Sequence, residues 1–227
     1  MNCVHNRLME GSTNLKALSF GAFWWHMFCG LGIPVAFWVS HHFRAADLKS
    51  GPDRALLILW ATQCPIVILL SSFFRKNPGR CSYLRAAGRG LLGLFAGAFV
   101  FALGAISLGA PVGSKYMLST INWSLLMSSF AFSPAAAVFG ASWVDWQRIF
   151  AKIRPTGSID YMVCLPALGS VIGSWFGAWP MPLDWERPWQ EWPICVTYGA
   201  LVGYAIGMVT SLMLFFPSCW KHYVKVD

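Results

Sequence analysis

The sequence predicts an all-α fold, a polytopic membrane bundle of about six transmembrane helices without a soluble domain. Hydrophobic residues make up 56% of the 227-residue chain and charged residues only 11%, whereas ordinary soluble domains contain about 25% charged residues. The charges are also segregated, because six stretches without Asp, Glu, Lys or Arg are each long enough to cross a bilayer as a helix. These stretches are apolar on every face, whereas barrel strands alternate between apolar and polar residues, so helices are predicted.

The six charge-free stretches define a single membrane domain over residues 1–227. The predicted spans cover residues 17–42, 55–74, 90–110, 118–140, 161–182 and 193–217. No low-complexity tract or linker interrupts them. The longest predicted connection, residues 145–160, is too short to fold alone, since chains below about 40 residues usually need staples. We therefore expect no soluble catalytic domain.

The first span predicts a retained signal anchor. Its apolar run is too long for a cleavable signal peptide, and residues 38–42 offer no small-residue cleavage site. Four spans contain a proline in their interior, at positions 34, 65, 134 and 166. Membrane bundles tolerate such prolines where neighbours satisfy the freed carbonyls, so kinks are expected at these positions.

The distribution of positive charge predicts the orientation. An even number of spans places both termini on one side, and most of the 17 lysines and arginines fall on that side. An excess of Lys and Arg marks the cytoplasmic face, so both termini are predicted to be cytosolic. The net charge of +8 then faces anionic lipid headgroups and is not a sign of nucleic-acid binding. The basic segment at residues 75–80 is interpreted as a topology determinant.

The spans contain few groups that could perform chemistry. Ion-coupled carriers usually place ionisable residues inside the bundle, and none is present apart from His26, which we expect to pair with a backbone carbonyl or a hydroxyl. The seven cysteines lack CxxC spacing and are interpreted as packing residues. The sequence has no HExxH motif and no nucleophile elbow, so no catalytic residue and no metal ligand are predicted in this chain.

Two predicted spans carry glycines at a spacing of four residues, which places them on one face of each helix. The helix-packing set is Gly169, Gly173 and Gly177 in the fifth span and Gly199, Gly203 and Gly207 in the sixth. Such a face lets another backbone approach closely, which drives helix association in lipid. Two interpretations stay open: the two faces pack on each other as an antiparallel hairpin, or one of them docks a helix of another protein.

The segment between these spans is rich in proline and tryptophan and cannot be a regular helix. Its tryptophans suit a membrane surface, so it could be a simple interfacial hairpin cap. Its charged residues favour a binding role, because the planar guanidinium of Arg187 suits a carboxylate or a phosphate, unless it pairs internally with a neighbouring acid. The candidate partner- or lipid-binding residues are Asp184, Trp185, Glu186, Arg187, Pro188 and Trp189.

This part of the chain resembles the C-terminal signature of the PIG-F family. Residues 173–190 read GSWFGAWPMPLDWERPWQ and are followed by Trp192-Pro193 and the glycines at 199, 203 and 207. The resemblance covers about the last third of the chain. Residues 109–111 and 143–150 are similar too, whereas the first hundred residues match only in hydropathy and approximate span count.

The resemblance implies an accessory subunit in glycosylphosphatidylinositol (GPI) anchor biosynthesis. Members are multi-pass proteins of the endoplasmic reticulum that bind large multi-pass catalytic subunits, which add ethanolamine phosphate to the GPI precursor. The zinc-dependent active site is then expected in the partner, and no cofactor in this chain. Membrane lipids are expected contacts, with the GPI precursor and phosphatidylethanolamine as candidates. The alternative is a scramblase or lipid carrier that acts alone, which the proline-containing helices suggest.

Overall fold

The computed structural model describes residues 2–44, 48–76, 78–79, 81–183 and 185–224; for 2–19, 43–44 and 215–224 it describes the backbone alone. The helices are α1 (Asn2–Arg44), α2 (Pro52–Phe73), α3 (Tyr83–Ser107), α4 (Ser114–Phe130), α5 (Phe132–Phe139), α6 (Trp143–Trp146), α7 (Ser158–Ala178) and α8 (Ile194–Val224), with a π-helical turn at Gln147–Ala151 and a 3₁₀ turn at Pro188–Gln190. The described ranges contain no strand, so the predicted all-α class is confirmed.

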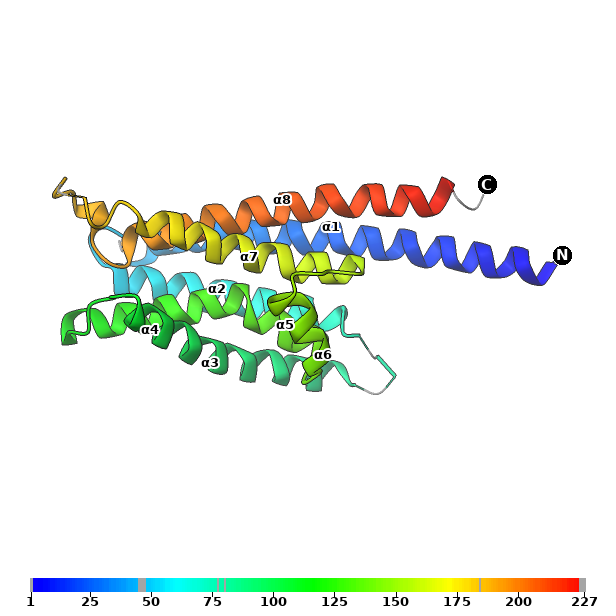
Figure 1. Ribbon diagram of the computed structural model, residues 1–227, viewed down its shortest axis with the longest axis horizontal. Coiled ribbons are helices and arrows are strands. Elements are labelled where there is room, and N and C mark those ends of the chain that lie inside the picture. Colours follow the sequence, from blue (N-terminus) through cyan, green and yellow to red (C-terminus); the bar gives the residue numbers. More distant parts are fainter. Residues whose placement is uncertain (1, 45–47, 77, 80, 184, 225–227) are drawn as a thin grey trace.

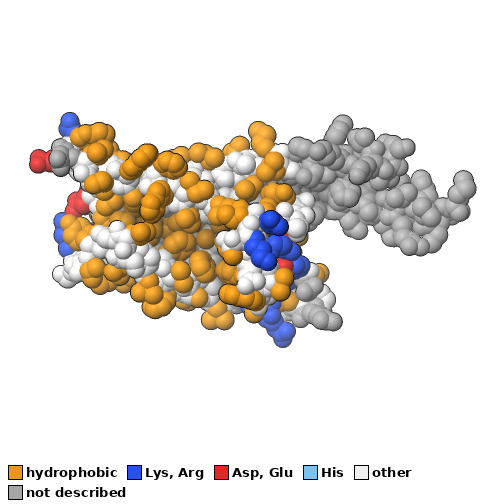
Figure 2. All heavy atoms as spheres, viewed as in Figure 1, with side chains coloured by type: hydrophobic (Ala, Val, Ile, Leu, Met, Phe, Trp, Pro, Cys, Tyr) orange, Lys and Arg blue, Asp and Glu red, His pale blue; other side chains and the backbone are white. Residues whose placement is uncertain are grey.

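Six helical segments of the described chain are long and apolar enough to cross a membrane. They are Phe20–His42, Pro52–Phe73, Tyr83–Ser107, Ser114–Phe139, Ser158–Ala178 and Ile194–Leu214. They lie roughly along one axis, and the two ends of the chain point the same way (Figure 1). On the face shown in Figure 2, hydrophobic side chains cover the middle of the described surface, while charged ones gather towards its two ends. This is the surface expected of a protein whose middle contacts lipid.

The third helix is longer than the charge-free stretch from which it was predicted. It begins at Tyr83, where the Ser82 hydroxyl caps the helix by accepting a hydrogen bond from the Arg85 backbone N–H at 3.4 Å. Arg85 and Arg89 therefore lie within the helix. A charge-free run marks the part that can sit in hydrocarbon, whereas the cap determines where the helix starts.

The fourth span is interrupted near its proline. Between α4 and α5, Ala131 has φ −112° and ψ −62°, outside regular helical geometry. Pro134 has no N–H to donate, and its ring clashes with the carbonyl four residues earlier, that of Phe130. The predicted distortion is therefore present at Pro134. Helices α1, α2 and α7 continue through Pro34, Pro65 and Pro166.

The main core is formed by buried side chains of α1, α2, α4 and α8. The rings of Phe130 and Tyr204 stack with centroids 4.1 Å apart and join α4 to α8. The Gln63 amide donates to the Cys29 carbonyl at 2.8 Å and joins α2 to α1. A side-chain amide is costly to expose to lipid, so this bond holds the two helices in register.

Candidate functional site

One buried side chain shapes the segment between α7 and α8, residues 179–193, which we call the α7–α8 loop. The Gln190 amide nitrogen donates to the carbonyl oxygens of Pro180 at 2.6 Å and Leu183 at 2.9 Å. Its side-chain oxygen accepts from the Arg187 backbone N–H at 2.9 Å. Prolines have no backbone N–H, so nearby carbonyls are left without helical donors. A glutamine side chain can donate to such carbonyls through its NH₂ and accept from a backbone N–H through its oxygen. Gln190 thus fixes the loop from inside.

The end of this loop is bonded to the start of α4. The Glu191 carboxylate accepts hydrogen bonds from Lys115 Nζ and from the Tyr116 hydroxyl, both at 3.0 Å. These two bonds, with the charge of Lys115, lower the pKa of Glu191 below its usual value. The Trp192 indole N–H donates to the Thr120 hydroxyl at 2.9 Å. The loop joins α7 and α8, and these bonds anchor it to a third membrane helix, α4.

The candidate binding residues lie on the outer part of this anchored loop. Trp185, Glu186, Arg187 and Pro188 are exposed, and the half-buried Trp189 has its ring 6.1 Å from that of Trp185. Asp184 lies outside the described residues. No ion pair joins Arg187 to Glu186, and the described residues supply no hydrogen-bond partner for the Arg187 guanidinium. The Arg187 side chain is exposed on this outer part of the loop.

Glu186 has a backbone conformation that few side chains adopt. Its φ is +49°, in the left-handed region. Non-glycine residues are uncommon there, and such conformations persist only where the surrounding structure imposes them. Arg187 directly follows Glu186, and the hydrogen bond from its backbone N–H to the Gln190 side chain supplies part of that constraint.

The two glycine faces contact each other. A Cβ atom placed on Gly173 would overlap the carbonyl oxygen of Gly199, and one placed on Gly203 would overlap that of Gly169. Gly177 meets the backbone of Cys195 and Val196, and Gly207 that of Leu165 and Pro166 in the same way. Of the two interpretations that the sequence left open, the structure adopts the antiparallel hairpin (Figure 1).

A buried ionic cluster lies at the opposite end of α7. Arg148 Nη2 donates to Asp145 at 2.9 Å and to Asp160 at 3.0 Å, and Lys76 Nζ donates to Asp145 at 2.6 Å. Burial alone would raise the pKa of Asp145, but the hydrogen bonds from Lys76 and Ser142 and the nearby positive charges outweigh it and lower that pKa. The cluster joins the segment after α2, the α6 turn and the start of α7. Lys76, interpreted from the sequence as a topology determinant, thus also has a packing role.

Sequence reasoning did not identify Gln190, Lys115 or this ionic cluster. A usable signal existed for Gln190, because it is the amide residue of a proline-rich segment that leaves many carbonyls unpaired. The Lys76–Asp145 pair offered none, since the two residues lie 69 residues apart in the chain.

Within the described ranges no group of three or more His, Cys, Asp or Glu residues is placed to hold a metal ion. His26 donates from Nδ1 to the Ala22 carbonyl at 2.8 Å, as expected for an isolated histidine in a helix. Cys29, Cys64, Cys81, Cys164 and Cys195 are buried free thiols.

The chain is similar to a known protein family over most of its length. The GPI biosynthesis protein family Pig-F matches residues 33–212, from the middle of α1 to near the end of the membrane part of α8. The chain belongs to this family. The match includes the α7–α8 loop, both glycine faces and the ionic cluster.

Individual Pig-F relatives align with part of the chain. The proteins named GPI ethanolamine phosphate transferase, stabilizing subunit, from Homo sapiens and Mus musculus are each 38% identical over 103 residues, which is 45% of this chain and 47% of theirs. Glycosylphosphatidylinositol anchor biosynthesis protein 11 of Yarrowia lipolytica is 32% identical over 162 residues, 70% of this chain and 67% of its own. The chain spans about half the length of the human and mouse relatives. No solved structure gives a significant match.

Proposed function

We propose that this chain is a non-catalytic stabilising subunit of a GPI ethanolamine phosphate transferase and binds the membrane part of the catalytic subunit. The observation that carries the proposal is membership of the Pig-F family together with the names of the human and mouse relatives. In this proposal the zinc-dependent transfer occurs in the catalytic partner.

The arrangement of the α7–α8 loop supports a binding role. Gln190 fixes the loop internally and Glu191 anchors it to α4, while Trp185 and Arg187 remain exposed. Aromatic and arginine side chains on a rigid support are the residue types that most often dominate protein interfaces. The catalytic subunit, or the phosphate of a lipid substrate, would meet the protein here.

The α7–α8 glycines are already used within the chain, so the catalytic subunit has to bind elsewhere. Large apolar side chains are exposed on α3, among them Leu92, Phe95 and Phe99. Such side chains contact lipid or a partner helix through dispersion forces. We assign the partner to these outer faces and to the α7–α8 loop.

Location and orientation form part of the proposal. The chain would lie in the endoplasmic reticulum membrane with cytosolic termini and with the α7–α8 loop in the lumen, where the sugars of the precursor are modified. Glycosylation acceptor sites inserted at either end and beside Arg187 test this. Modification beside Arg187 alone is expected, and modification at either terminus would require a different number of spans.

Affinity purification in mild detergent tests the function directly. The tagged chain is expressed in cells that lack their own stabilising subunit, and co-purifying proteins are identified. A large multi-pass transferase is expected, with transfer activity in the complex and none in this chain alone. Transfer of ethanolamine phosphate from phosphatidylethanolamine by the purified single chain would overturn the non-catalytic assignment. Lipid flux in vesicles that contain only this chain would favour the scramblase alternative.

A further inference from the structure

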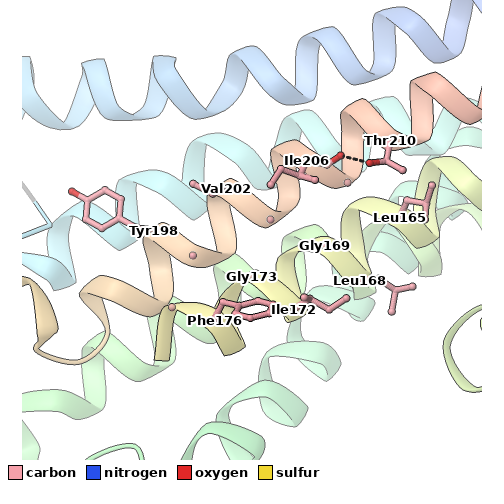
Figure 3. Close-up of a pocket in the computed structure, with 14 residues that line it drawn as sticks. Leu165, Leu168, Gly169, Ile172, Gly173, Phe176, Tyr198, Val202, Ile206 and Thr210 are labelled. Carbon is pink, nitrogen blue, oxygen red and sulfur yellow. Dashed lines mark hydrogen bonds between the residues drawn. The ribbon is translucent and has the colours of Figure 1, made fainter. Parts of the chain in front are cut away.

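An apolar groove of about 700 Å³ runs along the outer side of the α7–α8 hairpin. Figure 3 shows its two walls, with Ile172 and Phe176 along α7 and Val202 and Ile206 along α8, while glycines lie between them. All four wall side chains are exposed. The groove exists because the two backbones approach so closely that the flanking side chains stand out on either side of a floor without side chains.

The chemistry of the groove suits hydrocarbon. Its lining is apolar except for Tyr198 and Thr210, and the Thr210 hydroxyl donates to the Ile206 carbonyl of its own helix at 2.8 Å. A volume of about 700 Å³ falls within the range of small-molecule sites, about 300–1,000 Å³. From Leu165 to Gly177 the groove is about 18 Å long at the rise of an α-helix. That length is close to one leaflet of a hydrocarbon core about 30 Å thick.

A partner helix fits this groove poorly. The positions that Cβ atoms of the glycines would occupy are filled by the opposing helix, so no glycine face is left for a third backbone to approach.

A loop with charged side chains lies at one end of the groove. The lining ends at Gly177 on α7 and Tyr198 on α8, and the α7–α8 loop connects these two helix ends. That loop carries the exposed Arg187 beside the exposed Glu186, and the charge of Glu191 is paired with Lys115. A guanidinium at the end of a hydrocarbon groove is complementary to a phosphate attached to an acyl chain.

We propose that the α7–α8 groove binds an acyl chain of a membrane glycerophospholipid, whose phosphate is bound by Arg187. This lipid site goes beyond the proposed stabilising function, because it requires no catalytic subunit. The acyl chain would fill the outer groove of the hairpin both in the isolated chain and in the complex.

Photolabelling of the full chain in vesicles tests the site. One probe is a phospholipid with a diazirine near the end of one acyl chain, and the second is a diacylglycerol with the same chain and no phosphate. Label on the groove walls that unlabelled phospholipid competes away is expected. Ile206→Trp should fill the groove and reduce this label about tenfold, the equivalent of losing contact with roughly two methylenes. Arg187→Ala should reduce phospholipid labelling about threefold and leave diacylglycerol labelling unchanged.

The matched control is Val209→Trp, which adds the same ring to an exposed position of α8 outside the groove. Ile172→Trp fills the groove from the opposite wall and should reproduce Ile206→Trp if that variant folds poorly. Equal labelling of Ile206→Trp and Val209→Trp would overturn the site, as would equal, non-competed labelling of the exposed α3 residues Phe95 and Phe99. Loss of groove label when the catalytic subunit is present, with a cross-link from position 206 to that subunit, would show that a partner helix occupies the groove.

Discussion

Helix α4 and the α7–α8 hairpin show two different ways of packing helices in a membrane. In an 18-residue stretch of the span that contains α4 and α5, 89% of the residues are buried, against 33% in the corresponding stretch of α7. Side chains hold α4 in place: Ser128 donates to the Leu94 carbonyl at 2.7 Å, and Asn122 accepts from the Trp60 indole at 3.1 Å. The hairpin is held backbone to backbone at its glycines. Side-chain packing buries every residue of α4 from Asn122 to Phe130. Backbone packing leaves the outer side chains of the hairpin uncovered and available to lipid or a partner.

The hairpin is joined to the rest of the bundle at both ends of α7. At the loop end, Glu191 bonds to Lys115 and Trp192 to Thr120 of α4. At the other end, Arg148 bridges Asp145 and Asp160. The hairpin is thus a unit with its own internal contact that is fastened to the rest of the bundle by polar bonds. We therefore expect different effects on stability, assembly and activity from substitutions in four places: the hairpin, the ionic cluster, the loop surface and α4.

The largest effect is expected in the hairpin. Gly203→Leu inserts a branched side chain where the Gly169 carbonyl lies, and a helix backbone cannot move aside as a side chain can. We expect a destabilisation of about 3 kcal/mol, the upper end of typical overpacking, and a loss of assembled complex. Gly173→Leu should behave alike. Thermal unfolding in mild detergent and the amount of co-purified partner measure the two effects.

Gly104→Leu is the matched control. A Cβ atom at this α3 position meets nothing within 4 Å, so leucine there should keep the stability close to that of the unsubstituted chain. Equal stabilities of Gly203→Leu and Gly104→Leu would mean that the hairpin contact is not backbone to backbone.

A smaller effect is expected in the cluster that fastens the hairpin. Asp145→Asn leaves Lys76 and Arg148 without one carboxylate, but Lys76 is half exposed and Arg148 keeps Asp160. We expect a loss of about 1–2 kcal/mol, below the value for fully buried pairs. Thermal unfolding of both chains at several pH values is the measurement.

The pH dependence of that difference follows from the lowered pKa of Asp145. A depressed pKa contributes stability above the ordinary value of 3.8 and loses it as the pH falls through the lower, folded-state pKa. The gap between the unsubstituted chain and Asp145→Asn should therefore be constant from pH 7 to about pH 5 and shrink below pH 3.8. A gap that widens on acidification would contradict the assigned ion pairs.

On the loop surface, Arg187→Ala should change function without changing the fold. The side chain is exposed and has no described partner, so the level and unfolding temperature of this chain should not change. Transfer activity per molecule should fall about threefold if Arg187 binds a phosphate or a partner carboxylate. Arg187→Lys should restore little, because an ammonium lacks the bidentate fork. A lower amount of chain with unchanged activity per molecule would instead mean that the loop is only a hairpin cap.

The smallest effect is expected in α4. Ser128→Ala removes a hydrogen bond between helices, and such bonds average about 0.6 kcal/mol in membranes. Ser124→Ala is its control, because that hydroxyl donates to the Thr120 carbonyl of its own helix at 2.7 Å. Unfolding temperatures should rank Ser124→Ala above Ser128→Ala, and the reverse order would show that the α3–α4 contact does not depend on this bond.

The helices were predictable because bilayer thickness imposes a length on each charge-free run. The glycine faces were predictable because spacing of four residues places Gly169, Gly173 and Gly177 together on any α-helix. Spacing alone cannot say which backbone such a face will meet, so the sequence left two interpretations open, and only the three-dimensional arrangement identifies α8 as the neighbour.

The contacts between distant segments could not be predicted. Lys115 meets Glu191, and Lys76 meets Asp145, across long stretches of chain, and one sequence does not reveal which loops lie together. The central, buried position of α4 was not predicted, because hydropathy separates lipid from water and not lipid from protein. Gln190 was overlooked because its role appears only once the carbonyls that need its donors are located.

The polar character of α4 has a consequence for the order of events during synthesis. Its span has a mean hydropathy of 1.2, the lowest of the six in the described chain, whereas the span just before it, α3, has 2.1. A segment with many hydroxyl and amide groups enters a bilayer less readily by itself. The Gly93 and Leu94 carbonyls of α3 accept hydrogen bonds from the Ser128 hydroxyl. Once α3 is in the bilayer, it therefore offers α4 polar groups to bond with. We therefore expect α4 to leave the translocation channel together with α3. Because it enters the bilayer with a partner helix, α4 can become the centre of the bundle although it has the lowest affinity for lipid.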